Sequence, residues 1–354
     1  MILNCLDPLV IRMSDTRDVA AMLSTYADDV QPNRIEPLGS AGGFSGADFW
    51  RLSSTAGMFC LRLWPQDHPQ PKQLEFIHAV LGHVDRVGFH CVPVPVSRCD
   101  GSTFGVHHGR IYELTNWLPG EADFHQNPTP IRLNAAMTAL AQFHKAAESC
   151  MAYQFPDARS PGIESRLVQT QKLLTTELHQ IERSIYPSDW PSLETIARQL
   201  VKLVSASGSS TQRTLEQACQ VVVPLQPCIR DIWHDHVLFE GDRVAGFVDF
   251  GAMRVESVSG DIARLLGSLV GDDTDRWHRG ISSYIETRPL SDAERNLVVA
   301  FDRSNTLLSG INWVRWIYVE QRVFEQRRTI EQRLEQFIAR LSHQQSHSRN
   351  KLAL

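Results

Sequence analysis

The stretch "CIRDIWHDHVLFEGDRVAGFVDFGA", residues 228–252, holds an unusual concentration of polar side chains and decides the fold. Two aspartates and two histidines fall within six positions: Asp231, His234, Asp235 and His236. Asp249 follows inside a run that is otherwise apolar. The runs "HVLF" and "VAGFVDF" have the character of short strands and are separated by residues 240–243, so they predict a β-hairpin with a four-residue loop.

The expected register of this hairpin brings its polar residues together. We expect Phe239 to pair with Val244. This pairing returns Asp249 to the neighbourhood of Asp231 and His236, because cross-strand Cβ atoms lie roughly 5 Å apart. A carboxylate between apolar strand residues needs a compensating partner, and a divalent metal ion is a natural one.

Two reaction classes use such a cluster. One is hydrolysis at a metal held by the pair His234-x-His236. The other is phosphoryl transfer, in which one aspartate orients a substrate hydroxyl and a second holds the metal on the nucleotide phosphates.

The first half of the chain favours phosphoryl transfer. "EPLGSAGGFSGADFWRL", residues 36–52, is glycine-rich and strand-flanked, and Arg62 follows on the alternating run "MFCLRLW". This layout is typical of a loop that covers phosphates, and it does not open a helix as a P-loop would. The predicted phosphate-binding residues are Gly42, Gly43, Ser45, Gly46 and Arg62.

Five segments, in this order along the chain, resemble the aminoglycoside phosphotransferase and choline kinase family. They are "YELTNWLPGE" at 112–121, "LAQFHKA" at 140–146, Ile229-Arg-Asp231 through His236, Val248-Asp249-Phe250, and Asp261-Ile-Ala263. The resemblance covers about residues 35–330. It implies a two-lobed, protein-kinase-like α+β fold: an N-terminal antiparallel sheet lobe (1–117) that binds the nucleotide, a larger helical C-terminal lobe (118–345) for catalysis and substrate, and a polar tail (346–354).

The resemblance also implies an activity and roles for residues. The chain is expected to be an ATP-dependent phosphotransferase that moves the γ-phosphoryl group to a hydroxyl of a small molecule. Asp231 would be the catalytic base, and His236 and Asp249 the metal ligands. Glu75 would pair with Arg62, and the hinge around Glu113 and Thr115 would bind adenine.

The sequence departs from the family pattern at three positions. Ile229 replaces a histidine before the catalytic aspartate, His236 replaces an asparagine, and Arg62 replaces a lysine. Imidazole suits manganese better than magnesium, so the metal is expected to be Mg²⁺ or Mn²⁺. Two alternatives stay open: a nucleotide-binding pseudokinase that acts as an interaction module, and the metal hydrolase at His234-x-His236.

Composition sets the remaining expectations. A net charge of −5 argues against a nucleic-acid partner, whose binding needs a basic surface. Seven cysteines without a C-x-x-C pair fit reduced thiols in a cytoplasmic protein. No apolar run approaches the roughly 18 residues of a membrane span. Sugars, aminoglycosides, amino alcohols and homoserine-like compounds all stay open as the phosphoryl acceptor. The oligomeric state also stays open.

Overall fold

The computed structural model describes residues 16–39, 46–66, 68–150, 155–186, 190–322, 324 and 326–346. The chain divides into two compact units. The first contains the residues up to Asp85 together with Val92–Leu118, and the second contains Arg86–Cys91 and the residues from Pro119 onwards. None of the helices in the described ranges is long and apolar enough to cross a membrane.

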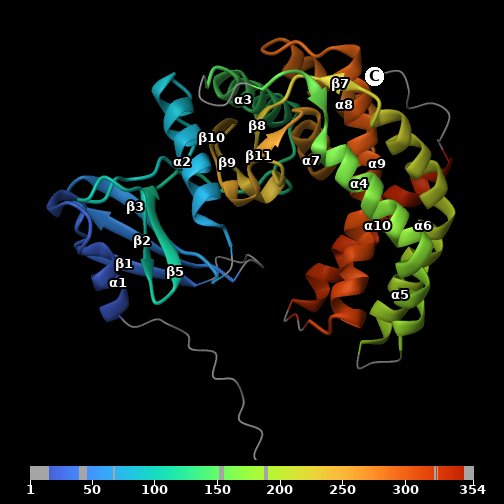
Figure 1. Cartoon of the computed structure of the whole chain (residues 1–354), viewed down its shortest axis with the longest axis horizontal. Helices are drawn as coiled ribbons and strands as arrows, with labels where there is room; N and C mark the ends of the chain where they lie inside the picture. Colours follow the sequence, from blue (N-terminus) through green and yellow to red (C-terminus); the bar gives the residue numbers. More distant parts are fainter. Residues whose placement is uncertain are drawn as a thin grey trace, which may run out of the picture. The chain divides into compact units, whose positions relative to one another are not determined.

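The first unit is built on an antiparallel sheet, drawn in blue to teal in Figure 1. Its described strands follow the order β1-β2-β3-β5-β4. Their bounds are β1 Arg34–Gly39, β2 Asp48–Ser54, β3 Gly57–Leu63, β4 Phe104–His107 and β5 Arg110–Asn116. The helices of this unit are α1 Thr16–Leu23 and α2 Pro71–Arg86, with a short 3-10 turn at Asp28–Val30.

Alternation along β3 separates the two faces of this sheet. Leu61 and Leu63 are buried and share a core with Met22 of α1. Arg62 therefore lies on the opposite face, because successive strand side chains point to opposite sides. Its partner across the ladder is Glu113 of β5, so the two side chains lie on the same face.

The second unit is mostly helical. Its α-helices are α3 Pro130–Glu148, α4 Pro161–Lys172, α5 Leu178–Ser184, α6 Pro191–Ala218, α7 Ser259–Val270, α8 Thr274–Ile285, α9 Asp292–Val314 and α10 Arg327–Ser346. Shorter helical turns lie at Leu173–Glu177, His234–His236, Phe250–Ala252 and Arg315–Val319. Apolar side chains of α5, α6, α9 and α10 form one continuous core.

In the described part of this unit, three two-stranded ribbons lie between the helices. They pair β6 Ala158–Arg159 with β7 Val222–Val223, β8 Gln226–Cys228 with β11 Arg254–Glu256, and β9 Val237–Glu240 with β10 Arg243–Phe247. The antiparallel sheet in the first unit and the helical second unit are both as the sequence predicts.

The β9–β10 ribbon is the hairpin predicted from the opening stretch. Phe239 pairs with Val244, as expected. The loop is shorter than the predicted four residues, because Glu240 and Arg243 also pair and leave a two-residue turn.

The second strand also ends earlier than expected. β10 ends at Phe247, and Asp249 lies beyond it with φ 63° and ψ 66°, in the left-handed region. The carboxylate therefore belongs to a turn and not to the interior of a strand. Aspartate tolerates this conformation better than most residues.

Candidate active site

The loop after β8 is fixed by a buried carboxylate on α7. Asp261 lies in the first turn of α7 and is completely buried. Its Oδ2 accepts the backbone N–H of Ile229 at 2.7 Å, and its Oδ1 accepts that of Arg230 at 2.6 Å. Arg230 has a positive φ of 70°, and these bonds hold it there. The same bonds therefore fix the backbone position of the next residue, Asp231.

A second layer of buried hydrogen bonds holds Asp261. His144 Nε2 lies 3.1 Å from Asp261 Oδ2, and His144 Nδ1 lies 2.7 Å from the hydroxyl of Tyr284. Burial lowers the pKa of His144, so the ring is neutral. A carboxylate only accepts, so Nε2 carries the ring proton and Nδ1 accepts from Tyr284.

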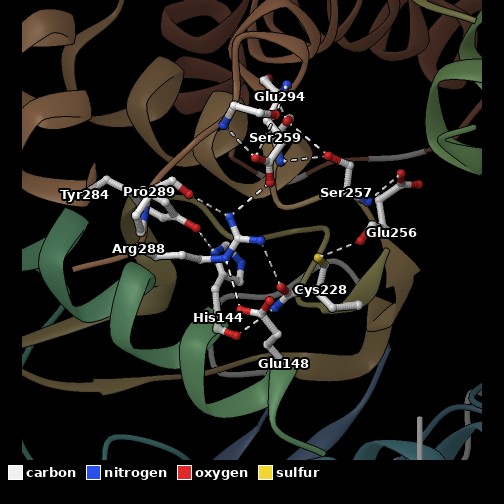
Figure 2. Close-up of polar contacts among 12 residues, drawn as sticks. His144, Glu148, Cys228, Glu256, Ser257, Ser259, Tyr284, Arg288, Pro289 and Glu294 are labelled. Carbon is white, nitrogen blue, oxygen red and sulfur yellow. Dashed lines mark hydrogen bonds and ion pairs between the residues drawn. The ribbon is translucent and has the colours of Figure 1, made fainter. Parts of the chain in front are cut away.

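Figure 2 shows a wider network of polar contacts around Arg288 and His144. Arg288 pairs with Glu294 at 3.0 Å and donates to Gln226 at 3.3 Å. Its Nε lies 3.6 Å from a carboxylate oxygen of Glu148. Gln226 in turn donates to the carbonyl of His144 at 2.7 Å. These bonds tie α3, α9 and the turn after α8 to β8, the strand that leads into the loop.

Asp231 presents its carboxylate to solvent. Its side chain is 52% exposed, and Oδ1 accepts from Arg264 Nη2 at 2.9 Å. Within the described residues Oδ2 has no protein donor. Asp231 can therefore accept a hydroxyl proton at Oδ2 while Arg264 fixes the orientation of the group.

His236 lies next to both Asp231 and Asp249. Its Nδ1 donates to the Asp231 carbonyl at 2.8 Å, and its Nε2 accepts from Trp233 Nε1 at 2.8 Å. Nε2 also lies 3.7 Å from Asp249 Oδ2. The structure thus brings the three predicted residues together. Both ring nitrogens are already bonded, so His236 offers no lone pair to a metal unless the bond from Trp233 breaks.

Asp249 fits a divalent cation better than His236 does. Its side chain is 40% exposed, and the residue lies in a left-handed turn after β10. A carboxylate oxygen is a preferred ligand of Mg²⁺. The hydrogen bond from Val248 N to His236 O, 3.0 Å long, fixes the chain just before this turn.

The alternative metal pair, His234-x-His236, belongs to no group of three metal-ligand atoms among the described residues. His234 Nε2 lies 3.2 Å from Asp235 Oδ1, and burial lowers the pKa of His234 to about 3. Among the described residues, the histidine-containing groups with metal-ligand spacing are Asp18 with His107 and His108, and His144 with Cys228 and Asp261. Neither group includes His234 or His236, so the geometry does not support a hydrolase centre there.

In the first unit, Arg62 is held by aromatic rings. Its guanidinium carbon lies 3.3 Å from the centroid of Trp64 and 5.0 Å from that of Phe49. The predicted partner Glu75 is exposed on α2, and the described residues contain no ion pair between it and Arg62. This part of the prediction is corrected, because the buried face of α2 is taken by other side chains: Leu74, Ile77, His78 and Leu81.

His78 takes the position expected for Glu75. Its Nε2 lies 2.6 Å from Glu113 Oε2, and both side chains are buried. The link from α2 to the sheet therefore runs through a histidine to β5 instead of through a glutamate to β3. The sequence signal was present, since His78 follows Ile77 on the apolar stripe of α2.

Of the other residues predicted to bind the nucleotide, the structure describes Thr115 and Gly46. Thr115 lies in the ladder opposite Cys60 and also bridges Pro95, so its backbone is inside the sheet. Gly46 precedes β2 with φ +74°, a conformation suited to glycine. Gly42, Gly43 and Ser45 lie outside the described residues.

Comparisons with known proteins agree with this architecture. The sequence profile of the phosphotransferase enzyme family matches residues 36–292. A homoserine kinase of Brucella melitensis is 24% identical over 274 residues, which are 75% of this chain and 74% of the relative.

Two solved structures show the same fold. An aminoglycoside phosphotransferase from Alicyclobacillus acidocaldarius has a TM-score of 0.63 at 16% identity, covering 93% of this chain and 96% of that one. A microcompartment-associated aminopropanol kinase has a TM-score of 0.62 at 14% identity, covering 96% and 100%. The chain therefore belongs to the phosphotransferase enzyme family and is a small-molecule kinase with the protein-kinase-like fold.

Proposed function

We propose that this kinase transfers the γ-phosphoryl group of ATP to a hydroxyl of a small molecule, with Asp231 as the base and Asp249 as the metal ligand. One arrangement carries the proposal: an exposed Asp231 on a loop fixed by the buried Asp261, with Asp249 close to the same His236 that bonds to the Asp231 carbonyl. Phosphoryl transfer needs positioning and charge neutralisation more than covalent chemistry, and this arrangement supplies the positioning and a carboxylate that would hold a neutralising metal ion.

Asp231 performs the proton transfer. The acceptor hydroxyl hydrogen-bonds to Oδ2 while Oδ1 stays paired with Arg264. As the acceptor oxygen bonds to the γ-phosphorus, the bond from that phosphorus to the leaving ADP oxygen breaks. The hydroxyl proton passes to Asp231.

Asp249 is the residue that would hold a divalent ion. Such an ion, Mg²⁺ in most kinases, neutralises phosphate charge during transfer. Two relatives with the same fold support nucleotide and metal use: a spectinomycin phosphotransferase in complex with ADP, and an amicoumacin kinase in complex with AMP-PNP and Ca²⁺. His236 would then hold the Asp231 backbone through its carbonyl without binding the ion itself.

The first unit would supply the nucleotide contacts. Arg62, fixed between Trp64 and Phe49, would bind phosphate oxygens, and Gly46 would let the backbone approach them. Gly42, Gly43, Ser45 and the backbone around Thr115 remain predicted contacts. The names of the homoserine and aminopropanol kinases support small hydroxyl compounds as acceptors.

The test is ADP release with ATP, Mg²⁺ and a panel of hydroxyl compounds, comparing the wild type with Asp231→Asn. We expect the variant to lose roughly 10²–10⁴ of kcat with little change in nucleotide affinity. Asp235→Asn is the matched control, because Asp235 is exposed and has no contact with Asp231 among the described residues. Near-normal turnover in Asp231→Asn would contradict the assignment of the base.

The pseudokinase alternative predicts nucleotide binding without ADP release for any acceptor. The structure weakens its main argument, the replacement of the family histidine by Ile229. The backbone N–H of Ile229 is bonded to Asp261, so the loop is held without that histidine.

A further inference from the structure

Three side chains with metal-binding atoms meet in the first unit, outside the candidate active site. Asp18 lies on α1, His107 ends β4, and His108 begins the turn to β5. One ligand atom of each side chain lies within 4.8 Å of those of the other two. Asp18 and His107 are partly buried and His108 is exposed, so the group is accessible to an ion from solvent.

The two histidines are neighbours in the sequence, yet both rings approach Asp18. Asp18 Oδ1 lies 2.8 Å from His107 Nε2 and 3.4 Å from His108 Nε2. Adjacent residues of an extended strand point to opposite sides of the sheet, which would separate the two rings. The positive φ of His108, 47°, breaks this alternation, and the ring centroids lie 4.2 Å apart.

The turn that contains His108 usually holds a different residue at this position. His107 pairs with Arg110, so His108 and Gly109 form a two-residue hairpin loop, and both have a positive φ. Such loops favour asparagine, aspartate or glycine at the first position. The needs of the turn therefore do not explain an imidazole there.

The spacing of the ligand atoms fits a tetrahedral metal ion. Zinc binds histidine nitrogen at about 2.0–2.1 Å and carboxylate oxygen at about 2.0–2.2 Å, so two such ligands lie roughly 3.3–3.5 Å apart. The 3.4 Å between Asp18 Oδ1 and His108 Nε2 matches this separation. The 2.8 Å contact with His107 Nε2 would have to lengthen by about 0.5 Å.

The charge of the group also suits a cation. The hydrogen bond from His107 lowers the pKa of Asp18, so the carboxylate is ionised at neutral pH, as a metal ligand must be. Two imidazole nitrogens favour zinc and similar transition metals over Mg²⁺ and Ca²⁺, which prefer oxygen ligands.

We propose that Asp18, His107 and His108 bind zinc or a similar divalent transition-metal ion, with solvent completing the coordination. The bound ion clips α1 to the β4–β5 turn, a link between Asp18 and His107, which are 89 positions apart in the sequence. A metal clip that closes a long loop reduces the freedom of the unfolded chain, so the ion stabilises the first unit. The site is separate from the metal ion proposed at Asp249 and does not depend on the kinase function.

Titration calorimetry of the chelator-treated full-length protein with ZnCl2, in the absence of nucleotide, tests the site. His108→Asn is the most informative variant, because asparagine suits the turn and removes the imidazole. We expect a zinc-binding step in the wild type whose Kd rises at least tenfold in His108→Asn and in His107→Gln. Even residues that only orient a metal ligand contribute about 10–100-fold to affinity, so losing a ligand should cost at least as much.

His179→Asn is the matched control. His179 is exposed and lies 3.9 Å from a carboxylate oxygen of Glu182, but it belongs to no three-ligand group among the described residues. The control should keep the Kd of the wild type. An equal Kd in the wild type and His108→Asn, as zinc bound at other histidines would give, would overturn the proposal. An equal rise in Kd in His179→Asn would also overturn it.

Two further measurements keep the test independent of any folding defect in a variant. Zinc at about 100 times its Kd should raise the Tm of the wild type by several degrees and leave that of His108→Asn unchanged. X-ray absorption spectroscopy of the zinc-loaded wild type should show two imidazole ligands. A zinc ion without imidazole ligands, or an equal rise of Tm in both proteins, would contradict the site.

Discussion

The carboxylate of Asp261 accepts the backbone N–H of Arg230 at 2.6 Å, and so fixes the residue directly before the catalytic aspartate. The same carboxylate accepts the N–H of Ile229 and contacts His144, so one buried group satisfies three partners. A buried charge is tolerated only when it is bonded in this way. The orientation of Asp231 therefore depends on a residue that does not touch the substrate.

Replacing Asp261 by asparagine should affect both stability and turnover. The asparagine side chain keeps one acceptor oxygen, but its NH2 group takes the place of the other carboxylate oxygen. Two N–H donors then face each other, and a buried donor is left unpaired. We expect the free energy of unfolding to fall by about 1–3 kcal/mol. We also expect kcat to fall at least tenfold in protein that is still folded. Denaturant unfolding and ADP release measure the two effects.

Asp302→Asn serves as the control for Asp261→Asn. Asp302 is also buried and pairs with Arg340 at 2.6 Å, away from the loop. This variant should lose stability without losing kcat per folded molecule. If Asp261→Asn behaved in the same way, Asp261 would stabilise the fold and have no part in positioning Asp231.

Arg62→Ala should weaken nucleotide binding. Losing a charge-assisted contact to phosphate costs about 1.5–3 kcal/mol, which is roughly a tenfold to hundredfold rise in Kd. Arg51→Ala is the matched control, because Arg51 lies on the neighbouring strand β2 and stacks on Trp117 instead. Titration calorimetry with AMP-PNP that gave one Kd for the wild type and Arg62→Ala would remove Arg62 from the nucleotide site.

Local sequence patterns predicted the parts of the structure that local forces decide. The alternation of apolar and polar residues around Arg62 predicted strand β3. The spacing of two apolar runs predicted the β9–β10 hairpin with its Phe239–Val244 pair. Asp231, His236 and Asp249 come together because this hairpin is short and its pairing is set by neighbouring residues.

Local sequence patterns could not predict the contacts between segments that are far apart in the sequence. The role of Asp261 depends on two distant segments, the loop after β8 and α3, which lie 32 and 117 positions away in the sequence. Likewise, the apolar stripe of α2 indicates that His78 faces inward, but nothing local shows that its partner is Glu113, 35 positions away.

His236→Asn tests whether the imidazole binds the metal. Since both ring nitrogens are hydrogen-bonded to the protein, we expect the ratio of Mg²⁺- to Mn²⁺-supported activity to stay within about twofold of the wild type. Asp249→Asn, by contrast, should raise the metal concentration needed for half-maximal activity by at least tenfold, because it removes a charged oxygen ligand. A clear shift toward Mg²⁺ in His236→Asn would show that His236 leaves Trp233 and ligates the ion.

The last prediction concerns the buried His144. Burial lowers its pKa in the folded protein, whereas the unfolded chain should titrate near 6.5. As the pH falls through about 6.5, His144 therefore binds a proton in the unfolded chain but not in the folded protein. The stabilising contribution is therefore complete above about pH 6.5 and is lost as the pH falls below it, by up to about 1.4 kcal/mol per pH unit.

We expect urea unfolding between pH 7 and pH 5 to show this slope in the wild type and a shallower slope in His144→Gln. His234, whose pKa burial also lowers, to about 3, keeps its own contribution in that variant. The absolute stability of His144→Gln also falls, because the contacts to Tyr284 and Asp261 are lost, so the slope is the informative quantity. His179→Gln is the control, since that exposed side chain should leave the slope unchanged. If His144→Gln kept the slope of the wild type, His144 would be protonated in the folded protein and paired as a cation with Asp261.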